Sequence, residues 1–136
     1  MRHDLQLQLV RNYPSLFVGY FRPPMDSAMA FGFECGDGWF DLIDTLCSQL
    51  IILERRDEAA GEEPLRVLQE KEKHGTLRFY VGAASEEAHA MIEFAEALSG
   101  RICERCGNRG HTRGTGWKKT RCDSCALAED VAKGSA

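Results

Sequence analysis

The clearest hydrophobic pattern in the chain is a stripe of apolar residues at steps of three and four between positions 39 and 56. Its members are Trp39, Leu42, Ile43, Leu46, Leu50 and Leu53. Residues three and four apart lie on one face of an α-helix, so this spacing predicts a helix that turns its apolar stripe toward a core. Asp37 or Gly38 is the expected N-terminal cap, and Asp41 suits the positive end of the helix dipole.

Two further segments have the pattern of helices. One opens at Ser85, a capping serine followed by two glutamates. Its expected buried face consists of Ala88, Met91, Ile92, Ala95, Leu98 and Ile102. The other covers residues 4–12 and stops before Pro14, which cannot continue a helix. Leu5 and Leu9 share a helical face there, although the alternating leucines of the same segment also fit a strand.

Three short segments are typical of β-strands. Residues 30–35 are rich in aromatic side chains, and the runs 65–71 and 77–81 flank the turn-forming pair His74-Gly75, which predicts a hairpin. Strands and helices that alternate in this way predict an α+β fold with a small three-stranded sheet and helices on one face.

Four of the six cysteines form two closely spaced pairs near the C-terminus. They are Cys103, Cys106, Cys122 and Cys125, which gives the pattern C-x2-C-x15-C-x2-C. Two residues between paired cysteines let one tight turn direct both sulfurs toward a metal ion about 2.3 Å away, and the longer segment brings the second pair round. The spacing therefore predicts one tetrahedral zinc site.

The segment around these pairs has the features of a small zinc finger. Glycines between the pairs favour a knuckle and a hairpin, and residues 126–132 have helical propensity, so a treble-clef or ribbon-type finger is expected. Four thiolates leave no open position on Zn²⁺, which predicts a structural site. Disulfides, a redox dithiol and an iron–sulfur centre are the competing interpretations. Cys35 and Cys47 lie outside the finger and are interpreted as small buried core residues.

The charge of the chain is unevenly distributed. The chain has a net charge of -4, but residues 1–100 carry 17 acidic and 9 basic side chains, whereas residues 101–136 carry 4 acidic and 8 basic ones. The pattern predicts an acidic α+β body over 1–100 and a basic four-cysteine zinc finger with a C-terminal helix over 101–136. Such asymmetry favours a charged partner, without identifying one.

The basic side chains of the finger are candidates for binding nucleic acid or a protein partner. They are Arg101, Arg105, Arg109, Arg113, Lys118, Lys119 and Arg121, accompanied by the aromatic Trp117. Cations hold a phosphate backbone and an aromatic ring stacks on a base. Equally, these cations could keep a tiny module in solution and pair with the acidic body while Trp117 covers its core. The sequence leaves both interpretations open.

Four carboxylates near the predicted start of the first long helix form a second candidate group. Glu34, Asp37, Asp41 and Asp44 could present an acidic surface to a partner, or hold a divalent metal for catalysis. The simpler interpretation is a helix cap with a solvated face. No phosphate-binding loop, nucleophile elbow or H-E-x-x-H helix occurs, so the sequence favours a protein that is not an enzyme and ranks a metal-dependent enzyme last.

Several stretches together resemble a family of small bacteriophage and prophage proteins of unassigned function. They are FECGDGW at 33–39, KEKHGTLRFY at 71–80, CERCG at 103–107 and GW at 116–117, followed by the second cysteine pair. The resemblance implies a small phage-borne protein that occupies a host or phage macromolecule, for example to inhibit a host defence complex. A transcription regulator that binds nucleic acid through the finger is the alternative.

The sequence also carries expectations about location and partners. No apolar run approaches the roughly 18 residues that span a bilayer, and the polar start lacks the apolar stretch of a signal peptide. We therefore expect a soluble protein of the bacterial host cytoplasm, with a protein partner, with nucleic acid as a second candidate partner and with no membrane association. The sequence does not specify an oligomeric state.

Overall fold

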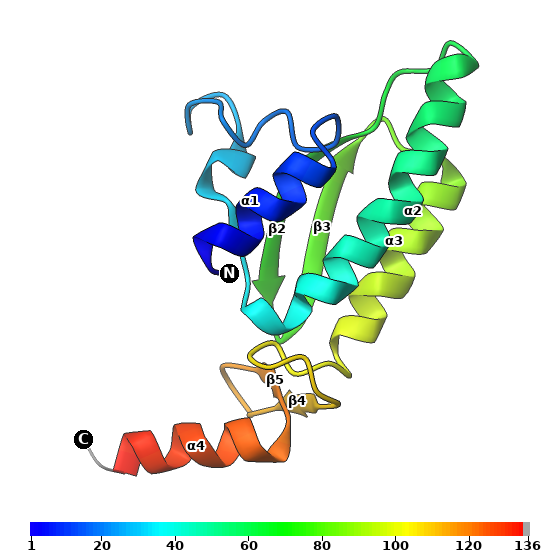
Figure 1. The fold of residues 1–136 in the computed structure, drawn as a ribbon. Helices are drawn as coiled ribbons and strands as arrows, with labels where there is room; N and C mark the ends of the chain where they lie inside the picture. The colour runs from blue at the N-terminus through cyan, green and yellow to red at the C-terminus, as the bar shows by residue number, and fades with distance from the viewer. Residues whose placement is uncertain (135–136) are drawn as a thin grey trace.

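A three-stranded sheet organises the first hundred residues of the computed structural model, which describes residues 1–134. The strands are β1 (Phe33–Glu34), β2 (Arg66–Lys73) and β3 (Thr76–Gly82), arranged in the order β1-β2-β3. β1 pairs with β2 in parallel, and β2 pairs with β3 as an antiparallel hairpin. Figure 1 shows the sheet above the C-terminal segment.

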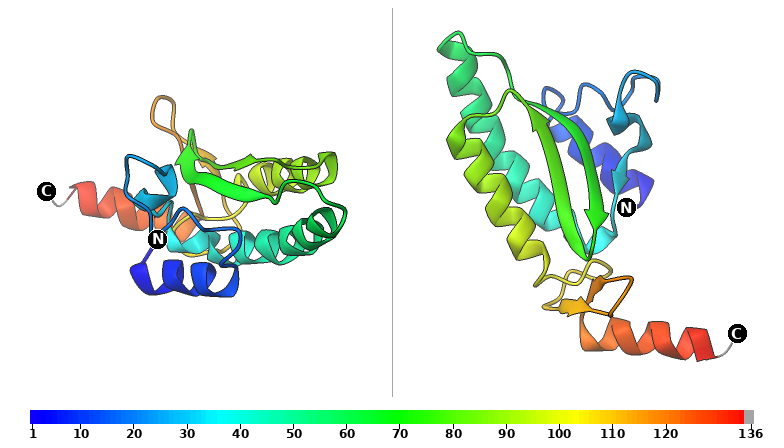
Figure 2. Two further views of the ribbon diagram at one scale, coloured as in Figure 1. Left: turned by 90° about the horizontal axis from the view of Figure 1, so that it is seen from above. Right: turned by 180° about the vertical axis from the view of Figure 1, so that it is seen from behind.

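Helices cover one face of this sheet. α1 (His3–Asn12) and α2 (Phe40–Ala59) lie in front of β2 and β3 in Figure 1, and the view from behind in Figure 2 shows the two strands uncovered by any described helix. The core between sheet and helices includes Leu9, Leu16, Phe17, Met29, Trp39, Ile43, Leu50 and Leu77, all buried. The α+β class, the three strands and the covered face are confirmed.

The third helix, α3 (Glu86–Ser99), packs against β3 and α2 and also supplies hydrogen bonds to the free edge of the sheet. The backbone N–H of Leu77 donates to Ser99 Oγ at 2.8 Å, and that of Phe79 donates to Glu96 Oε2 at 2.9 Å. Side chains of α3 therefore satisfy donors that an edge strand would otherwise present to solvent or to another chain. Ser85 caps the helix by accepting from the N–H of Ala88, as predicted.

The hairpin forms around the turn that the sequence indicated. His74 and Gly75 both have positive φ angles, 55° and 86°, as a two-residue hairpin turn requires. A bulge lies between Val67 and Gln69, and it shifts the alternation of β2. As a consequence Glu70, and not Gln69, points into the core.

Two local predictions differ from the structure. The expected strand 30–35 is limited to Phe33–Glu34, because residues Ala28–Phe31 form a 3₁₀ turn capped by Ser27. Asp37 and Gly38 do not cap α2: they lie in a second 3₁₀ turn, Asp37–Trp39, and Trp39 precedes the helix without a side-chain cap. In this turn the N–H of Gly38 contacts the C-terminal segment by donating to Glu104 O.

The C-terminal segment contains a cysteine knuckle, a short hairpin and a helix. An isolated bridge pairs Ile102 with Arg109 around the knuckle. β4 (His111–Arg113) and β5 (Lys119–Arg121) form the hairpin, and α4 (Asp123–Gly134) extends away from the body in Figure 1. These parts are those expected of a treble-clef or ribbon-type finger; residues 135 and 136 of the predicted module lie outside the described part.

None of the helices within residues 1–134 has both the length and the apolar character needed to cross a membrane. α2 is the longest at 20 residues and turns an apolar stripe inward while exposing charged side chains.

Candidate metal centre and its surroundings

Four cysteine sulfurs meet at one point of the C-terminal segment. The Sγ atoms of Cys103, Cys106, Cys122 and Cys125 all lie within 4.8 Å of one another, and Cys106 Sγ is 3.6 Å from Cys122 Sγ. A tetrahedron with metal–sulfur bonds of about 2.3 Å has sulfur–sulfur edges of about 3.8 Å. The four side chains can therefore hold one metal ion, as the spacing predicted.

The local backbone places both pairs of sulfurs. The N–H of Gly107 donates to Cys103 O at 2.9 Å, and the N–H of Cys103 donates to Asn108 O at 2.7 Å, which closes the first knuckle. Cys122 follows β5 directly, and Cys125 lies in the first turn of α4. The N–H of Cys125 donates to Cys122 Sγ at 3.4 Å, which holds the second pair of sulfurs in place.

The electrostatics of the four thiols differ. Burial disfavours a charge on Cys103, but the backbone N–H groups of Cys122, Cys106 and Arg105 outweigh it and lower the pKa of Cys103 to about 6. Burial, with the neighbouring thiols, raises the pKa of Cys125. Successive deprotonation crowds negative charges into a small volume, and a bound divalent cation would stabilise all four thiolates together.

The donor set also limits the chemistry of the site. Four sulfurs fill a tetrahedral coordination sphere, so a metal held by all of them keeps no position for water or substrate. The other two cysteines, Cys35 and Cys47, are not part of the sulfur cluster. They are buried within the core of the body, in agreement with the interpretation from sequence.

The body holds the first cysteine pair through the turn before α2. The N–H of Gly38 donates to Glu104 O at 2.7 Å, and the indole N–H of Trp39 donates to Ile102 O at 2.9 Å. A Cβ atom on Gly38 would lie 2.1 Å from Cys103 O, so only glycine allows this approach. The Gly-Asp-Gly-Trp stretch is thus the part of the body that contacts the knuckle.

The hairpin tip of the body holds the second side of the site. Thr120 Oγ1 donates to Gly75 O at 2.5 Å and is 3.0 Å from Thr112 Oγ1. The N–H of Glu104 donates to Thr120 O at 3.1 Å, which ties the knuckle to β5. Both turns of the body therefore contact the finger, although the sequence suggested a boundary between them near residue 100.

Two of the predicted binding cations are engaged within the finger. Arg121 is buried and forms ion pairs with Glu104 at 3.5 Å and with Glu129 at 2.7 Å. Arg113 pairs with Asp123 and donates from Nε to Arg121 O at 3.1 Å. Their guanidinium groups are held in fixed positions by these contacts.

The remaining members of the basic set lie at the surface. Arg101, Arg105, Arg109 and Lys118 are exposed, Lys119 is half-buried, and none of the five has an ion pair within residues 1–134. Trp117 is 81% exposed, so it does not cover a core of the finger. These side chains remain candidates for contact with a partner.

The four predicted carboxylates are not gathered into one site. Asp37 accepts the backbone N–H of Arg2 at 2.7 Å, and Asp44 accepts the hydroxyl of Tyr13 at 2.7 Å. Glu34 lies on β1 beside Gln69, and Asp41 is exposed on α2. Among the described residues, the cysteine cluster is the only group of three or more potential ligands within reach of one ion.

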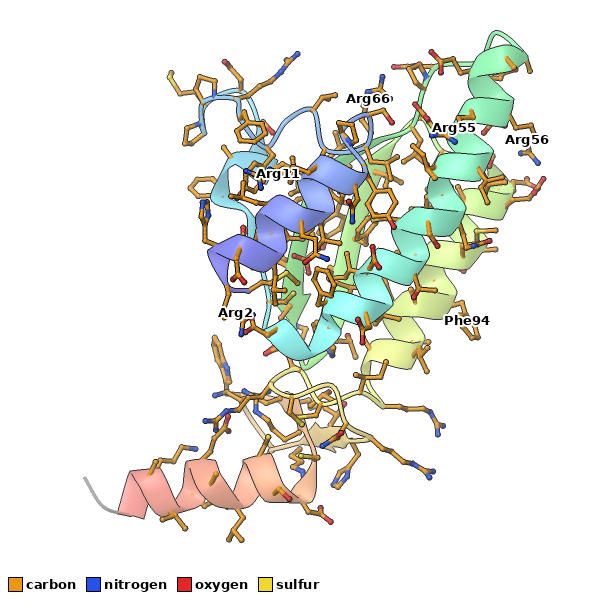
Figure 3. The ribbon with its side chains drawn as sticks, viewed as in Figure 1. Arg2, Arg11, Arg55, Arg56, Arg66 and Phe94 are labelled. Atoms are coloured by element: carbon orange, nitrogen blue, oxygen red, sulfur yellow. The ribbon has the colours of Figure 1, made fainter. Side chains whose placement is uncertain are left out.

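Three features were not identified from the sequence. An apolar groove runs between α2 and α3, and Phe94 at its rim is 70% exposed and projects away from the body in Figure 3. A hollow in the finger brings His111 together with Arg101, Arg109 and Arg113 of the predicted basic set. Glu70 is fully buried in the core. The alternation of Arg109, His111 and Arg113 is the sequence signal that could have revealed the hollow.

Comparisons with protein-family models, with curated protein sequences and with solved structures each give no match for this chain.

Proposed function

We propose that the chain is a non-enzymatic, zinc-stabilised interaction protein whose body binds a protein partner. Zn²⁺ suits the four thiolates because it accepts sulfur ligands in a tetrahedron without a redox change. Iron bound by four sulfurs is the alternative occupant. Metal binding of order 10 kcal/mol would supply much of the folding free energy of a module this small. The ion acts as a scaffold, and the surfaces around it and on the body make the contacts.

The resemblance to bacteriophage and prophage proteins supports a phage or prophage origin. A phage-borne protein of this kind works in the cytoplasm of the bacterial host, where inhibition of a host defence complex is one role that needs only stoichiometric binding. A transcription regulator would need the finger to contact nucleic acid, and a metal-dependent enzyme would need carboxylates that act together. We rank these second and last.

The observation that carries the proposal is the groove between α2 and α3. It has a volume of about 440 Å³ and is lined mainly by apolar side chains: Leu42, Leu46, Met91, Phe94, Ala95 and Leu98. Ile52, also on α2, is exposed as well. An exposed apolar groove of this kind is typical of a site that receives the apolar face of a partner helix.

The charge of the body specifies that helix further. None of the side chains that line the groove is charged, but residues 1–100 of the body carry 17 acidic and 9 basic side chains. Arg56, near the end of α2, is already paired with Glu87 at 2.9 Å. We therefore assign the groove to an amphipathic helix whose polar face carries lysines or arginines.

A defined peptide pair tests this assignment. A helical peptide with leucines on one face and lysines on the other is titrated into the zinc-loaded protein, beside a scrambled peptide of the same composition that has no apolar stripe. We expect only the striped peptide to bind. Phe94→Ser should weaken its binding at least about tenfold, as for the loss of an aromatic side chain that the partner would bury.

Phe31→Ser is the matched control, because Phe31 is 64% exposed on the body but does not line the groove. It should leave binding unchanged. Equal binding of the two peptides, or equal losses in the two variants, would show that general attraction to the acidic body is responsible and would overturn the groove assignment. A partner captured from host cells must show the same dependence on Phe94.

A further inference from the structure

A second surface, separate from the groove, lies beside the cysteine cluster. It is a hollow of about 620 Å³ in the finger. Its side chains include Arg101, Arg109, His111, Arg113, Cys122 and Asp123. Three arginines and a histidine thus face a hollow whose described acidic side chain is Asp123, already paired with Arg113.

The backbone explains why these cations meet. Arg109, His111 and Arg113 are spaced by two residues along an extended segment, so their side chains leave it on the same face. The bridge between Ile102 and Arg109, with the hydrogen bond from Gly110 N–H to Arg101 O at 2.9 Å, places Arg101 alongside. The fold of the finger therefore brings Arg101 and Arg113 to the same hollow, although they are far apart in the sequence.

The guanidinium groups have unequal freedom. Arg113 is fixed by Asp123 and by the carbonyl of Arg121, whereas Arg101 and Arg109 are exposed and have no ion pair in the part of the chain described. An anion in the hollow would meet two free guanidinium groups beside a fixed one. Planar guanidinium groups bind phosphate oxygens through pairs of parallel hydrogen bonds.

A neighbouring hollow extends the surface. It shares Arg113 with the first and has a volume of about 400 Å³. Its lining includes Trp117, the cations Lys119, Arg121 and Lys133, and the carboxylates Asp130 and Glu129, of which Glu129 is paired with Arg121. The two hollows together add cations and an exposed indole to the surface around Arg113. Repeated cations with an aromatic ring that can stack on an unpaired base are the pattern of a single-strand binding surface.

We propose that the finger binds the phosphate backbone of single-stranded nucleic acid, with Arg101 and Arg109 contacting phosphates and Trp117 stacking on a base. The site requires a folded finger but does not depend on the partner of the α2–α3 groove, so it goes beyond the function proposed above. The negative charge of the body repels a polyanion and so lowers the affinity. The contacts between the cations and the phosphates weaken as salt is added, so binding should be strongest at low salt.

The test uses zinc-loaded full-length protein and a fluorescent oligothymidine, with the affinity measured over a series of salt concentrations. For single strands the slope of log K against log salt is about 0.7 per phosphate neutralised. Arg101→Ala combined with Arg109→Ala should make the slope shallower by about 1.4. Trp117→Ala should weaken binding about 5- to 150-fold through the lost stacking.

Arg11→Ala combined with Arg55→Ala is the matched control. It removes the same charge from exposed positions that lie on the body, away from the finger in Figure 3. We expect it to leave the slope unchanged. Similar slopes for the two double variants would mean that net charge alone acts, and would overturn the site. Zinc content and circular dichroism establish that each variant is folded.

Two further measurements distinguish single-stranded nucleic acid from a duplex and from free inorganic phosphate. A duplex of the same length should bind more weakly than the single strand and should be insensitive to Trp117→Ala. Inorganic phosphate should compete only weakly, because it contacts one position of the surface. Strong competition by inorganic phosphate with no preference for the oligonucleotide, or preference for the duplex, would overturn the single-strand proposal.

Discussion

The indole N–H of Trp39 donates a 2.9 Å hydrogen bond to the carbonyl of Ile102, the residue just before the first cysteine of the cluster. Trp39 is the largest fully buried side chain of the body. The ring of Trp39 therefore packs in the hydrophobic core, while its N–H holds the backbone next to the first cysteine. This contact couples the packing of the body to the position of the first cysteine pair.

Trp39→Phe tests that coupling. Phenylalanine keeps most of the apolar volume but leaves the Ile102 carbonyl without its donor, which should lower the free energy of unfolding by about 1–3 kcal/mol. It should also speed the loss of metal to a competing chelator, because the knuckle loses a support. Urea unfolding and chelator competition measure the two effects. Trp117→Phe, at an exposed ring, should change neither; equal effects in both variants would contradict the coupling.

Gly38→Ala tests the close approach of the body to the knuckle. The added Cβ would meet Cys103 O at 2.1 Å, and a backbone carbonyl beside a metal ligand cannot move aside cheaply. We expect a loss of stability of about 3 kcal/mol, at the upper end of the usual range for overpacking. Thermal and urea unfolding of the metal-loaded protein provide the measurement.

Gly116→Ala is the control for this substitution, since no atom lies within 4 Å of a Cβ at that position. Its stability should stay within about 0.5 kcal/mol of the natural chain. If Gly38→Ala were equally neutral, the turn before α2 would not be held against the finger as described.

The buried carboxyl group of Glu70 should make the stability of the fold depend on pH. Both of its carboxylate oxygens are buried without a hydrogen-bond partner in the described chain, and burial raises its pKa to about 8, opposed by the Cys35 thiol and the ammonium group of Met1. A pKa raised on folding means that the folded state holds a proton which the unfolded chain releases. Stability should therefore decrease as pH rises from about 4.5 to about 8.

Glu70→Gln should remove this contribution, so the difference in stability between the natural chain and the variant should change by at most about 1.4 kcal/mol per pH unit over that range. Urea unfolding at several pH values measures it. Glu62→Gln, at an exposed position after α2, should retain the slope of the natural chain. A parallel pH dependence for Glu70→Gln and the natural chain would contradict a neutral buried carboxyl group.

Some of these features were predictable from sequence because they depend on spacing alone. The stripe from Trp39 to Leu53 and the cysteine spacing each specify a local geometry, and both α2 and the sulfur cluster are present. The hairpin followed from His74-Gly75, whose positive φ angles favour a two-residue turn. Periodicity and turn chemistry are sufficient for elements of this kind.

Other features depend on contacts between distant residues. Period-two alternation from Val67 would place Gln69 inward, and only the bulge after Val67 turns Glu70 into the core. Arg121 has the same character in sequence as Arg105, yet it is buried because Glu104 and Glu129 approach it from separate elements. No local pattern distinguishes a structural arginine from a free one.

The central claim is that one zinc ion is held by four cysteine sulfurs, and X-ray absorption at the zinc edge of the purified protein tests it most directly. We predict one zinc per chain with a first shell of four sulfurs at about 2.3 Å, the distance of a tetrathiolate site. A shell that contains nitrogen or oxygen, or a protein that is folded with iron or no metal in place of zinc, would contradict the account.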